Sequence, residues 1–256
     1  MTDILQQIID NKRREVEAMS RHSNISFTSL EPRRHRSMAT ALAGSKTGII
    51  AEFKRRSPSK GEIYPMAMVS DIIPSYTEAG ASACSILTDT PYFGGALSDL
   101  ASARTVTDIP LLRKDFIVSE FQIAEAAIYG ADAILLIASA LTREEIVRLT
   151  DHAHSLHLEV LLELHSENEI DKLYTAADMV GINNRNLSTF DTDPNLSLTL
   201  ADKLPDNIIK VAESGLTSMT EVRKLRDAGY RGFLIGETFM RNPHPGNALR
   251  EFLEGV

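Results

Sequence analysis

The chain has 256 residues, 43% of them hydrophobic, and a formal net charge of −8. This length can bury one sizeable core and suits a single α/β barrel domain, whereas the acidic balance argues against a general nucleic-acid-binding protein. The lone cysteine, Cys84, excludes an intrachain disulfide and indicates a reducing compartment.

The chain contains no run of about 18 apolar residues that would span a membrane. Residues 1–6 carry an early acid and lack the apolar stretch of a signal peptide. We therefore expect a cytoplasmic protein. Positive charge is concentrated in residues 1–60, and the remainder is acidic. This excess is interpreted either as a solvated basic segment or as a positive potential near an anionic substrate.

Residues 3–20 are the first predicted element, an amphipathic helix. Its face is built by side chains that recur at helical spacing, namely Leu5, Ile8, Ile9, Lys12, Val16 and Met19. Asp3 and Gln6 resemble a capping box. Residues 21–47 are polar, and we expect them to be irregular, with the basic run at 33–36 on a solvated surface.

From residue 48 onward, apolar segments alternate with amphipathic ones. Continuously apolar segments such as 133–137 are typical of parallel strands that are buried on both faces. The expected strands are 48–53, 82–88, 110–113, 132–138, 159–164, 179–183, 208–212 and 232–236. The expected helices lie near 68–79, 95–107, 119–129, 142–156, 166–175, 193–203, 217–228 and 244–254. Gly80, Gly130 and Gly229 are helix C-terminal signals.

Eight β–α units predict an α/β fold, a single (β/α)8 TIM barrel. We expect one domain over residues 1–256, in which 1–47 form an N-terminal helical extension and 48–256 form the barrel. A doubly wound sheet is the alternative, but it usually carries a G-x-G-x-x-G turn after its first strand, and this chain has none.

The active site of such a barrel lies at the carboxyl ends of its strands, so polar residues there are candidates. Glu52 and Lys54 point to the same side of the first strand. Lys114 ends the third strand, Glu163 lies inside the fifth, and Asn183 ends the sixth. Each has a structural alternative, such as an ion pair or a turn cap. Buried charges cost several kcal/mol unless paired, so their gathering at one mouth favours a functional site.

Two glycines, Gly215 and Gly236, follow the seventh and eighth strands. The loops at these positions of many barrels bind phosphate through backbone N–H groups, and glycine lets the backbone approach the anion. The alternative is that both are ordinary turn glycines. Their occurrence at both strands predicts a phosphate site.

Six motifs follow one another at the strand ends. They are Glu-Phe-Lys-Arg-Arg-Ser-Pro-Ser-Lys-Gly at 52–61, Leu-Leu-Arg-Lys-Asp-Phe-Ile at 111–117, Leu-Leu-Glu-Leu-His at 161–165, Gly-Ile-Asn-Asn-Arg-Asn-Leu at 181–187, Val-Ala-Glu-Ser-Gly at 211–215 and Phe-Leu-Ile-Gly-Glu at 233–237. With the N-terminal helix, this series closely resembles the indole-3-glycerol phosphate synthase family of tryptophan biosynthesis over essentially the whole chain. The first and second motifs are the most specific.

The resemblance implies a lyase that closes an indole ring. Its substrate would be 1-(2-carboxyphenylamino)-1-deoxyribulose 5-phosphate, which loses carbon dioxide and water to give indole-3-glycerol phosphate. It implies no metal and no organic cofactor, and the seven histidines show no metal-ligand spacing. We expect a monomer whose partner is this phosphorylated small molecule, with no nucleic-acid or membrane partner.

The resemblance also implies roles for the charged candidates. Lys114 would be the general acid at the sugar carbonyl, and Glu163 the base, with Glu52 and Lys54 as their partners. We expect neighbouring cations, chiefly Lys54, to lower the pKa of Lys114. The division of acid roles between the two lysines stays open.

Further residues would bind the substrate. Lys54 and Arg185 are candidates for its two anionic ends, and Gly215 and Gly236 for its phosphate. Asn183, Glu213 and Ser214 would bond the sugar hydroxyls. The aromatic ring would lie in an apolar slot, whose candidate residues are Pro58, Phe93, Phe116, Leu135 and Leu187. The alternative is that these five side chains belong to the ordinary core of the barrel. Residues 57–61, beginning with Ser57, would form a flap, and the N-terminal helix either a lid or a cover for the barrel edge. Glu237 departs from a serine also seen in the family. A carboxylate beside the phosphate would be unfavourable unless it points away, so only the Gly236 backbone is carried over from the family.

Three other functions remain as alternatives. A Schiff-base aldolase would use Lys114, Lys54 or Lys210 as its nucleophile. Another phosphate-binding barrel enzyme, such as phosphoribosylanthranilate isomerase, need not carry the Glu-Phe-Lys strand or the N-terminal helix. A binding module that has lost catalysis would be expected to lack Lys114 or Glu163, and both are present.

Overall fold

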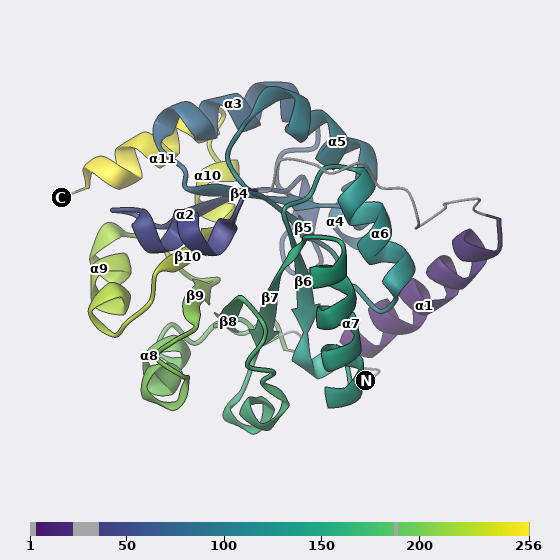
Figure 1. Cartoon of the computed structure of the whole chain (residues 1–256). Coiled ribbons are helices and arrows are strands. Elements are labelled where there is room, and N and C mark those ends of the chain that lie inside the picture. The colour runs from purple at the N-terminus through teal and green to yellow at the C-terminus, as the bar shows by residue number, and fades with distance from the viewer. Residues whose placement is uncertain (1–3, 23–35, 187–188, 256) are drawn as a thin grey trace.

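Eight parallel strands form a closed barrel in the computed structural model, which describes residues 4–22, 36–186 and 189–255 (Figure 1). The strands are β1 (Ile49–Phe53), β4 (Ala83–Leu87), β5 (Leu111–Lys114), β6 (Ala133–Ile137), β7 (Glu159–Leu164), β8 (Met179–Asn183), β9 (Ile209–Glu213) and β10 (Gly232–Ile235). They pair in this order, and β10 closes onto β1. The predicted (β/α)8 barrel is confirmed, and each strand lies within one residue of its expected bounds.

Helices cover the outside of the barrel between successive strands (Figure 1). They are α3 (Val69–Ala79), α5 (Leu97–Val106), α6 (Glu120–Ile128), α7 (Arg143–Ser155), α8 (Leu196–Leu200), α9 (Met219–Asp227) and α11 (Pro245–Glu254). The helix expected near 166–175 is instead the 3-10 helix η2 (Glu167–Lys172), and two shorter 3-10 turns are η1 (Ala138–Ala140) and η3 (Ala201–Lys203). Gly80, Gly130 and Gly229 end helices with φ of 100°, 97° and 96°, as their sequence positions predict.

A helix that sequence patterning missed lies at the amino-terminal end of the barrel. Residues 21–47 were expected to be irregular, but α2 (Met38–Gly44) contacts β4 and β9 and buries Met38 and Leu42. Its first N–H groups donate to the Glu159 carboxylate at the start of β7, with Met38 N at 2.7 Å. Such a short helix depends on this tertiary anchor rather than on its own propensity.

The basic run at 33–36 was expected to be solvated, and residues 33–35 lie outside the described parts of the chain. Arg36 departs from this expectation, because its side chain is only 17% exposed and pairs with Asp108 at 2.6 Å. Three short elements lie near the carboxyl ends of the strands: the hairpin of β2 (Arg56–Ser57) and β3 (Gly61–Glu62), α4 (Thr90–Phe93) and α10 (Glu237–Met240).

The N-terminal helix α1 (Ile4–His22) lies at the right of Figure 1, beside α6 and α7, and packs on α6 and η1. Its apolar stripe is buried as predicted, except that Met19 is exposed. Lys12 lies on that stripe, is only 5% exposed, and pairs with Asp89 at 2.7 Å and Asp115 at 3.1 Å. Asp3, the expected capping residue, lies outside the described residues. Within those residues, no helix combines the length and the apolar character that crossing a membrane would require.

Candidate active site

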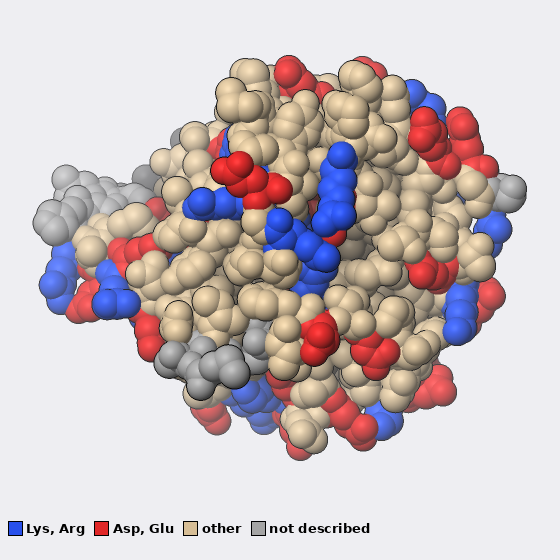
Figure 2. Space-filling view, turned by 180° about the vertical axis from the view of Figure 1, so that it is seen from behind, with Lys and Arg blue, Asp and Glu red and all other residues tan. Residues whose placement is uncertain are grey.

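A cavity of about 410 Å³ opens at the carboxyl ends of the strands. The end of every barrel strand, or the residues directly after it, contributes to its lining, and α1 adds Leu5 and Ile8. Figure 2 shows this face from behind the view of Figure 1, with Lys and Arg side chains gathered around a hollow near its centre. Basic side chains therefore surround the mouth of a protein whose net charge is −8, which favours an anionic ligand.

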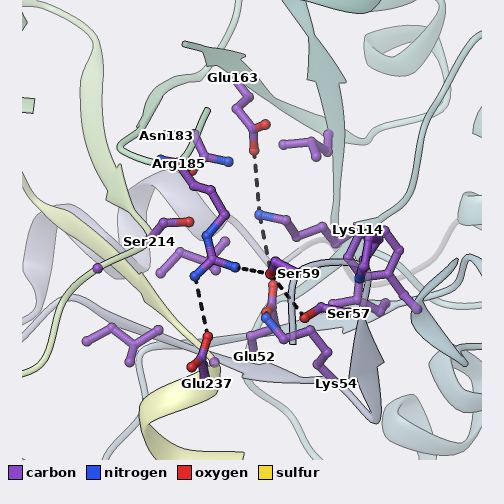
Figure 3. A pocket seen from close by; sticks show the side chains of 18 of the residues that line it. Glu52, Lys54, Ser57, Ser59, Lys114, Glu163, Asn183, Arg185, Ser214 and Glu237 are labelled. Carbon is purple, nitrogen blue, oxygen red and sulfur yellow. Dashed lines mark hydrogen bonds and ion pairs between the residues drawn. The ribbon is translucent and has the colours of Figure 1, made fainter. Parts of the chain in front are cut away.

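The floor of the cavity is a cluster of buried charges (Figure 3). The Lys114 Nζ lies 2.6 Å from Glu213 Oε2, 3.5 Å from Glu163 Oε2 and 3.9 Å from Glu52 Oε2. The Lys54 Nζ lies 2.6 Å from Glu52 Oε1. Strands β1, β5, β7 and β9 and the residue after β1 thus bring together five charged side chains from four segments that are far apart in the sequence.

The three carboxylates set the protonation of Lys114. Burial by itself would lower the pKa of Lys114, but the charges of Glu213, Glu163 and Glu52 outweigh it and raise that pKa above its usual value. The expectation that neighbouring cations lower this pKa is therefore wrong. Its physical reason is that carboxylates surround the Lys114 ammonium, while the ammonium of Lys54 is itself engaged by Glu52.

The same cluster sets the pKa values of its carboxylates. Burial opposes ionisation of Glu163 and Glu52, yet Lys114 and His165 lower the pKa of Glu163, and Lys54 and Lys114 lower the pKa of Glu52. Burial raises the pKa of Glu213 to about 8 despite the Lys114 ammonium, and the charge of Glu163 adds to the rise. Glu213 is fully buried and is not among the described residues that line the cavity. It therefore contacts Lys114 and does not face the space in which the sugar hydroxyls were expected to bind it.

Two loops on one side of the cavity carry the candidate phosphate glycines. Ser214 and Gly215 are consecutive left-handed residues, with φ of 65° and 76°, and both line the cavity after β9. A serine held in this conformation is strained, and such strain is frequent at functional sites. Gly236 lines the cavity after β10, and the Thr238 hydroxyl donates to Leu216 O at 2.9 Å, which joins the two loops.

Arg185 lies beside these loops. Its guanidinium donates to Ser59 Oγ at 2.7 Å and lies 3.3 Å from Glu237 Oε2 (Figure 3). Glu237 also pairs with Arg241 at 2.8 Å and with Lys60 at 3.8 Å. Glu237 lines the cavity, so its carboxylate lies near the candidate phosphate loops. Three cations neutralise it, which removes the electrostatic objection to its position.

Apolar side chains line another part of the cavity. Pro58, Phe93, Phe116 and Leu135 are among them, and the Phe93 and Phe116 ring centroids are 6.1 Å apart. Leu187 lies outside the described residues. Sequence reasoning missed eight apolar lining residues: Leu5, Ile8, Leu87, Ile137, Phe190, Leu216, Leu234 and Ile235. Helical spacing marked the first two as buried, but it carries no information about what they face.

The expected flap at 57–61 is the β2–β3 hairpin, and Ser57, Pro58 and Ser59 line the cavity. Arg55 anchors its base through two hydrogen bonds to Asp99, at 2.6 and 2.9 Å. Asn183 lines the cavity and accepts from the Arg185 backbone N–H at 3.0 Å. Lys210 lies near the amino end of β9, donates to Ala201 O, and is not among the described lining residues, so it does not fit the aldolase alternative.

Comparison with known proteins gives a consistent result. The sequence model described as indole-3-glycerol phosphate synthase matches residues 5–252. A protein named indole-3-glycerol phosphate synthase from Bacteroides thetaiotaomicron is 52% identical over 100% of both chains. Proteins of the same name from Burkholderia multivorans and Koribacter versatilis are 44% and 42% identical, over 97% and 99% of this chain and 98% and 100% of theirs.

Solved structures of more distant proteins share the fold. An N-acetylmannosamine-6-phosphate 2-epimerase from Clostridium perfringens aligns with a TM-score of 0.62 at 14% identity, over 89% of this chain and 100% of that one. A thiamine phosphate pyrophosphorylase from Pyrococcus furiosus aligns with a TM-score of 0.60 at 16% identity, over 82% and 95%. At these identities the likeness shows the barrel fold alone.

Proposed function

Because the chain belongs to the indole-3-glycerol phosphate synthase family, a family of carboxy-lyases in tryptophan biosynthesis, we propose how its cavity binds the substrate and which side chains carry the reaction. The substrate is 1-(2-carboxyphenylamino)-1-deoxyribulose 5-phosphate. The observation that carries this proposal is Lys114, an ammonium held among three carboxylates at the floor of a cavity with cations at its mouth and aromatic rings in its wall.

Lys114 promotes the first step, ring closure. The ring carbon that bears the carboxylate attacks the sugar carbonyl carbon, and the carbonyl oxygen becomes a hydroxyl by taking a proton. The raised pKa of Lys114 keeps it an ammonium at neutral pH, so it stabilises the developing alkoxide by charge and hydrogen bonding as well as donating the proton. Carbon dioxide then leaves, and the electron pair of the broken bond restores the aromatic ring.

Glu163 acts in the second step, loss of water. The new hydroxyl leaves with a proton from a lysine, and a proton must leave the adjacent carbon of the new five-membered ring. The lowered pKa of Glu163 keeps it ionised and ready to accept that proton. Glu52 holds Lys54 at 2.6 Å and so positions the second ammonium of the floor.

The two anionic ends of the substrate suit two different parts of the cavity. We assign the phosphate to the loops at Gly215 and Gly236, with Arg185 as its cation, because Arg185 contacts Glu237 directly after Gly236. The carboxylate then falls to Lys54. The aromatic ring fits against Pro58, Phe93 and Phe116, since ligand pockets are largely apolar with a few convergent polar groups.

The test supplies the purified protein with the carboxyphenylamino substrate and follows indole fluorescence. Lys114→Ala and Glu163→Gln should each lower kcat by about a hundredfold or more, the range for lost acid–base catalysis, while inorganic phosphate still binds. Equal loss of turnover and of phosphate binding would point to misfolding. A substrate adduct trapped on Lys114 by borohydride would defeat the non-covalent role and favour the aldolase alternative.

A further inference from the structure

The buried floor of the cavity has more negative than positive groups. Its carboxylates are Glu52, Glu163 and Glu213, each at most 3% exposed, and its ammonium groups are Lys54 and Lys114. An uncompensated buried charge costs several kcal/mol. With its pKa raised to about 8, Glu213 is largely protonated at neutral pH. Glu52 contacts Lys54 at 2.6 Å, whereas Lys114 lies 3.5 Å from Glu163, so the ionised Glu163 calls for a closer cation.

His165 is placed to supply that cation. It follows β7 two residues after Glu163, so the two side chains extend to the same side of the chain. Its ring is 9% exposed, and its Nε2 lies 3.0 Å from Glu163 Oε1. The other oxygen of Glu163 faces Lys114 at 3.5 Å (Figure 3), so the base is held between an ammonium and an imidazole.

The other charged groups that face His165 are acidic. Its Nδ1 lies 3.9 Å from Glu169 Oε2 on η2, and Glu213 on β9 adds a further negative field. The same Glu169 oxygen accepts from the His165 backbone N–H at 2.7 Å, which fixes the start of the loop. His165 is not among the described residues that line the cavity, so it would act through Glu163 rather than touch the substrate.

We propose that His165 is a positioning residue whose imidazolium contacts Glu163 Oε1 and holds Glu163 ionised and in place, with Oε2 directed toward Lys114 and the substrate. This inference rests on the proposed role of Glu163 as the base. A carboxylate can take the proton of the ring only while it is ionised, and a cation within about 4–6 Å favours its ionised form.

The expected protonation agrees with the geometry. Burial opposes the imidazolium, but Glu163 and Glu169 outweigh it and raise the pKa of His165 above its usual value. The imidazolium is therefore present below this raised pKa and is lost as the pH rises through it. Turnover should decline over the same alkaline range.

His165→Gln tests the charge separately from the side-chain contact, because glutamine keeps an amide donor but carries no charge. We expect kcat to fall about tenfold or more and KM to change less than about twofold, since Glu163 touches the reaction and His165 does not touch substrate. The acid limb of the kcat profile should move up by about one pH unit, because the pKa of Glu163 rises when the positive charge beside it is lost.

The matched control is His154→Gln. His154 also places its Nε2 beside a carboxylate, Asp178 at 2.9 Å, but on α7, and it is not among the described residues of the cavity lining. This variant should keep the native kcat and pH profile. A His165→Gln enzyme with the native kcat and pH profile would overturn the inference.

Nitrogen NMR of histidine-labelled protein gives a readout that needs no turnover. The signal of His165 is identified by its loss in His165→Gln. It should titrate above the ordinary histidine pKa of about 6.5 in the native protein and at a lower pH in Glu163→Gln. A neutral His165 at pH 6 in the native protein would contradict the inference. If Glu163→Gln kept its turnover, the role of Glu163 as the base would be refuted. The NMR titration would still show whether His165 is charged.

Discussion

At the scale of single residues, two glycines make room for the carboxylates of the catalytic floor. A Cβ at Gly236 would lie 2.4 Å from Glu52 Oε1, and a Cβ at Gly181 would lie 2.3 Å from Glu213 Oε1. Neither position has a positive φ, so close approach rather than backbone conformation requires glycine there. The sequence suggested a phosphate-binding reason for Gly236, and the structure adds an independent steric one.

Gly236→Ala should therefore damage catalysis more than stability. The new methyl group must displace the Glu52 carboxylate, which holds Lys54 at 2.6 Å, and misplaced catalytic groups lose large factors in rate. We expect kcat to fall at least about tenfold. Steady-state kinetics and thermal unfolding would measure the two effects.

Gly44→Ala is the control for that substitution, because a Cβ there meets nothing within 4 Å. It should leave kcat unchanged. A Gly236→Ala protein with native kcat would show that Glu52 tolerates displacement, and a protein that fails to fold would show that the contact is structural.

At the scale of elements, α1 is joined to the catalytic strand β5 by a buried ion cluster. Lys12 reaches from α1 to Asp115, the residue directly after Lys114, and to Asp89. Asp115 also pairs with Arg113 at 3.2 Å and accepts from the Thr88 hydroxyl at 2.7 Å. The N-terminal helix thus does two things in the folded chain: it lines the cavity through Leu5 and Ile8, and it fixes the end of the strand that presents Lys114.

Lys12→Met should destabilise the protein by about 3–5 kcal/mol, the cost of removing one partner from a buried charge pair. Arg13→Met is the matched control on the same helix. The Arg13 side chain is 48% exposed, and it pairs with Glu145 at 3.2 Å. That exposed pair should contribute at most about 1 kcal/mol. Denaturant unfolding of the two variants measures the difference, and similar losses would refute the anchoring role of Lys12.

The effect of Lys12→Met should also depend on pH. Burial opposes ionisation of Asp115, but Arg113 and Lys12 outweigh it and lower its pKa in the folded protein. A carboxyl with a lowered pKa adds stability above its usual pKa of 3.8, and that stability is lost as the pH falls through the folded-state pKa. The difference between native and Lys12→Met stability should therefore shrink below about pH 4.

At the scale of the whole molecule, charge is arranged so that an acidic protein presents cations at its mouth (Figure 2). Arg185, Lys60, Arg241 and Lys54 lie at or near the cavity, and its substrate carries a phosphate and a carboxylate. A basic mouth attracts such a substrate over distances comparable with the screening length of the solution. Lys54 and Lys60 belong to the basic first 60 residues, whereas Arg185 and Arg241 come from later parts of the chain. The positive potential at the mouth therefore does not come from the basic start of the chain alone.

The value of kcat/KM should consequently fall several-fold as salt rises from about 0.01 to 1 M, over which the screening length falls from about 30 to 3 Å. The buried floor is shielded from added ions, so kcat should change little. Initial rates in sodium chloride, repeated in an uncharged osmolyte as the control, would measure this. An equal fall of kcat would instead point to an effect of salt on the chemical step.

The strand pattern of the chain determined the barrel. Eight largely apolar segments, buried on both faces, leave few other ways to satisfy their backbone groups, and the strand-end motifs identified the charged candidates. Sequence did not reveal α2, whose seven residues depend on Glu159, and it left open whether α1 lies over the cavity or only covers the barrel edge, because both arise from contacts between distant segments.

Tertiary structure alone decided the protonation of the site. The sequence placed Lys54 two residues from Glu52 and suggested that cations would lower the pKa of Lys114, but the barrel surrounds Lys114 with three carboxylates and raises it. It also puts His165 behind Glu163 and directs Glu237 into the cavity between cations. Residue types along a strand follow from local periodicity, whereas a pKa follows from burial and from charges a few ångströms away on other strands, and only the closed barrel sets those distances.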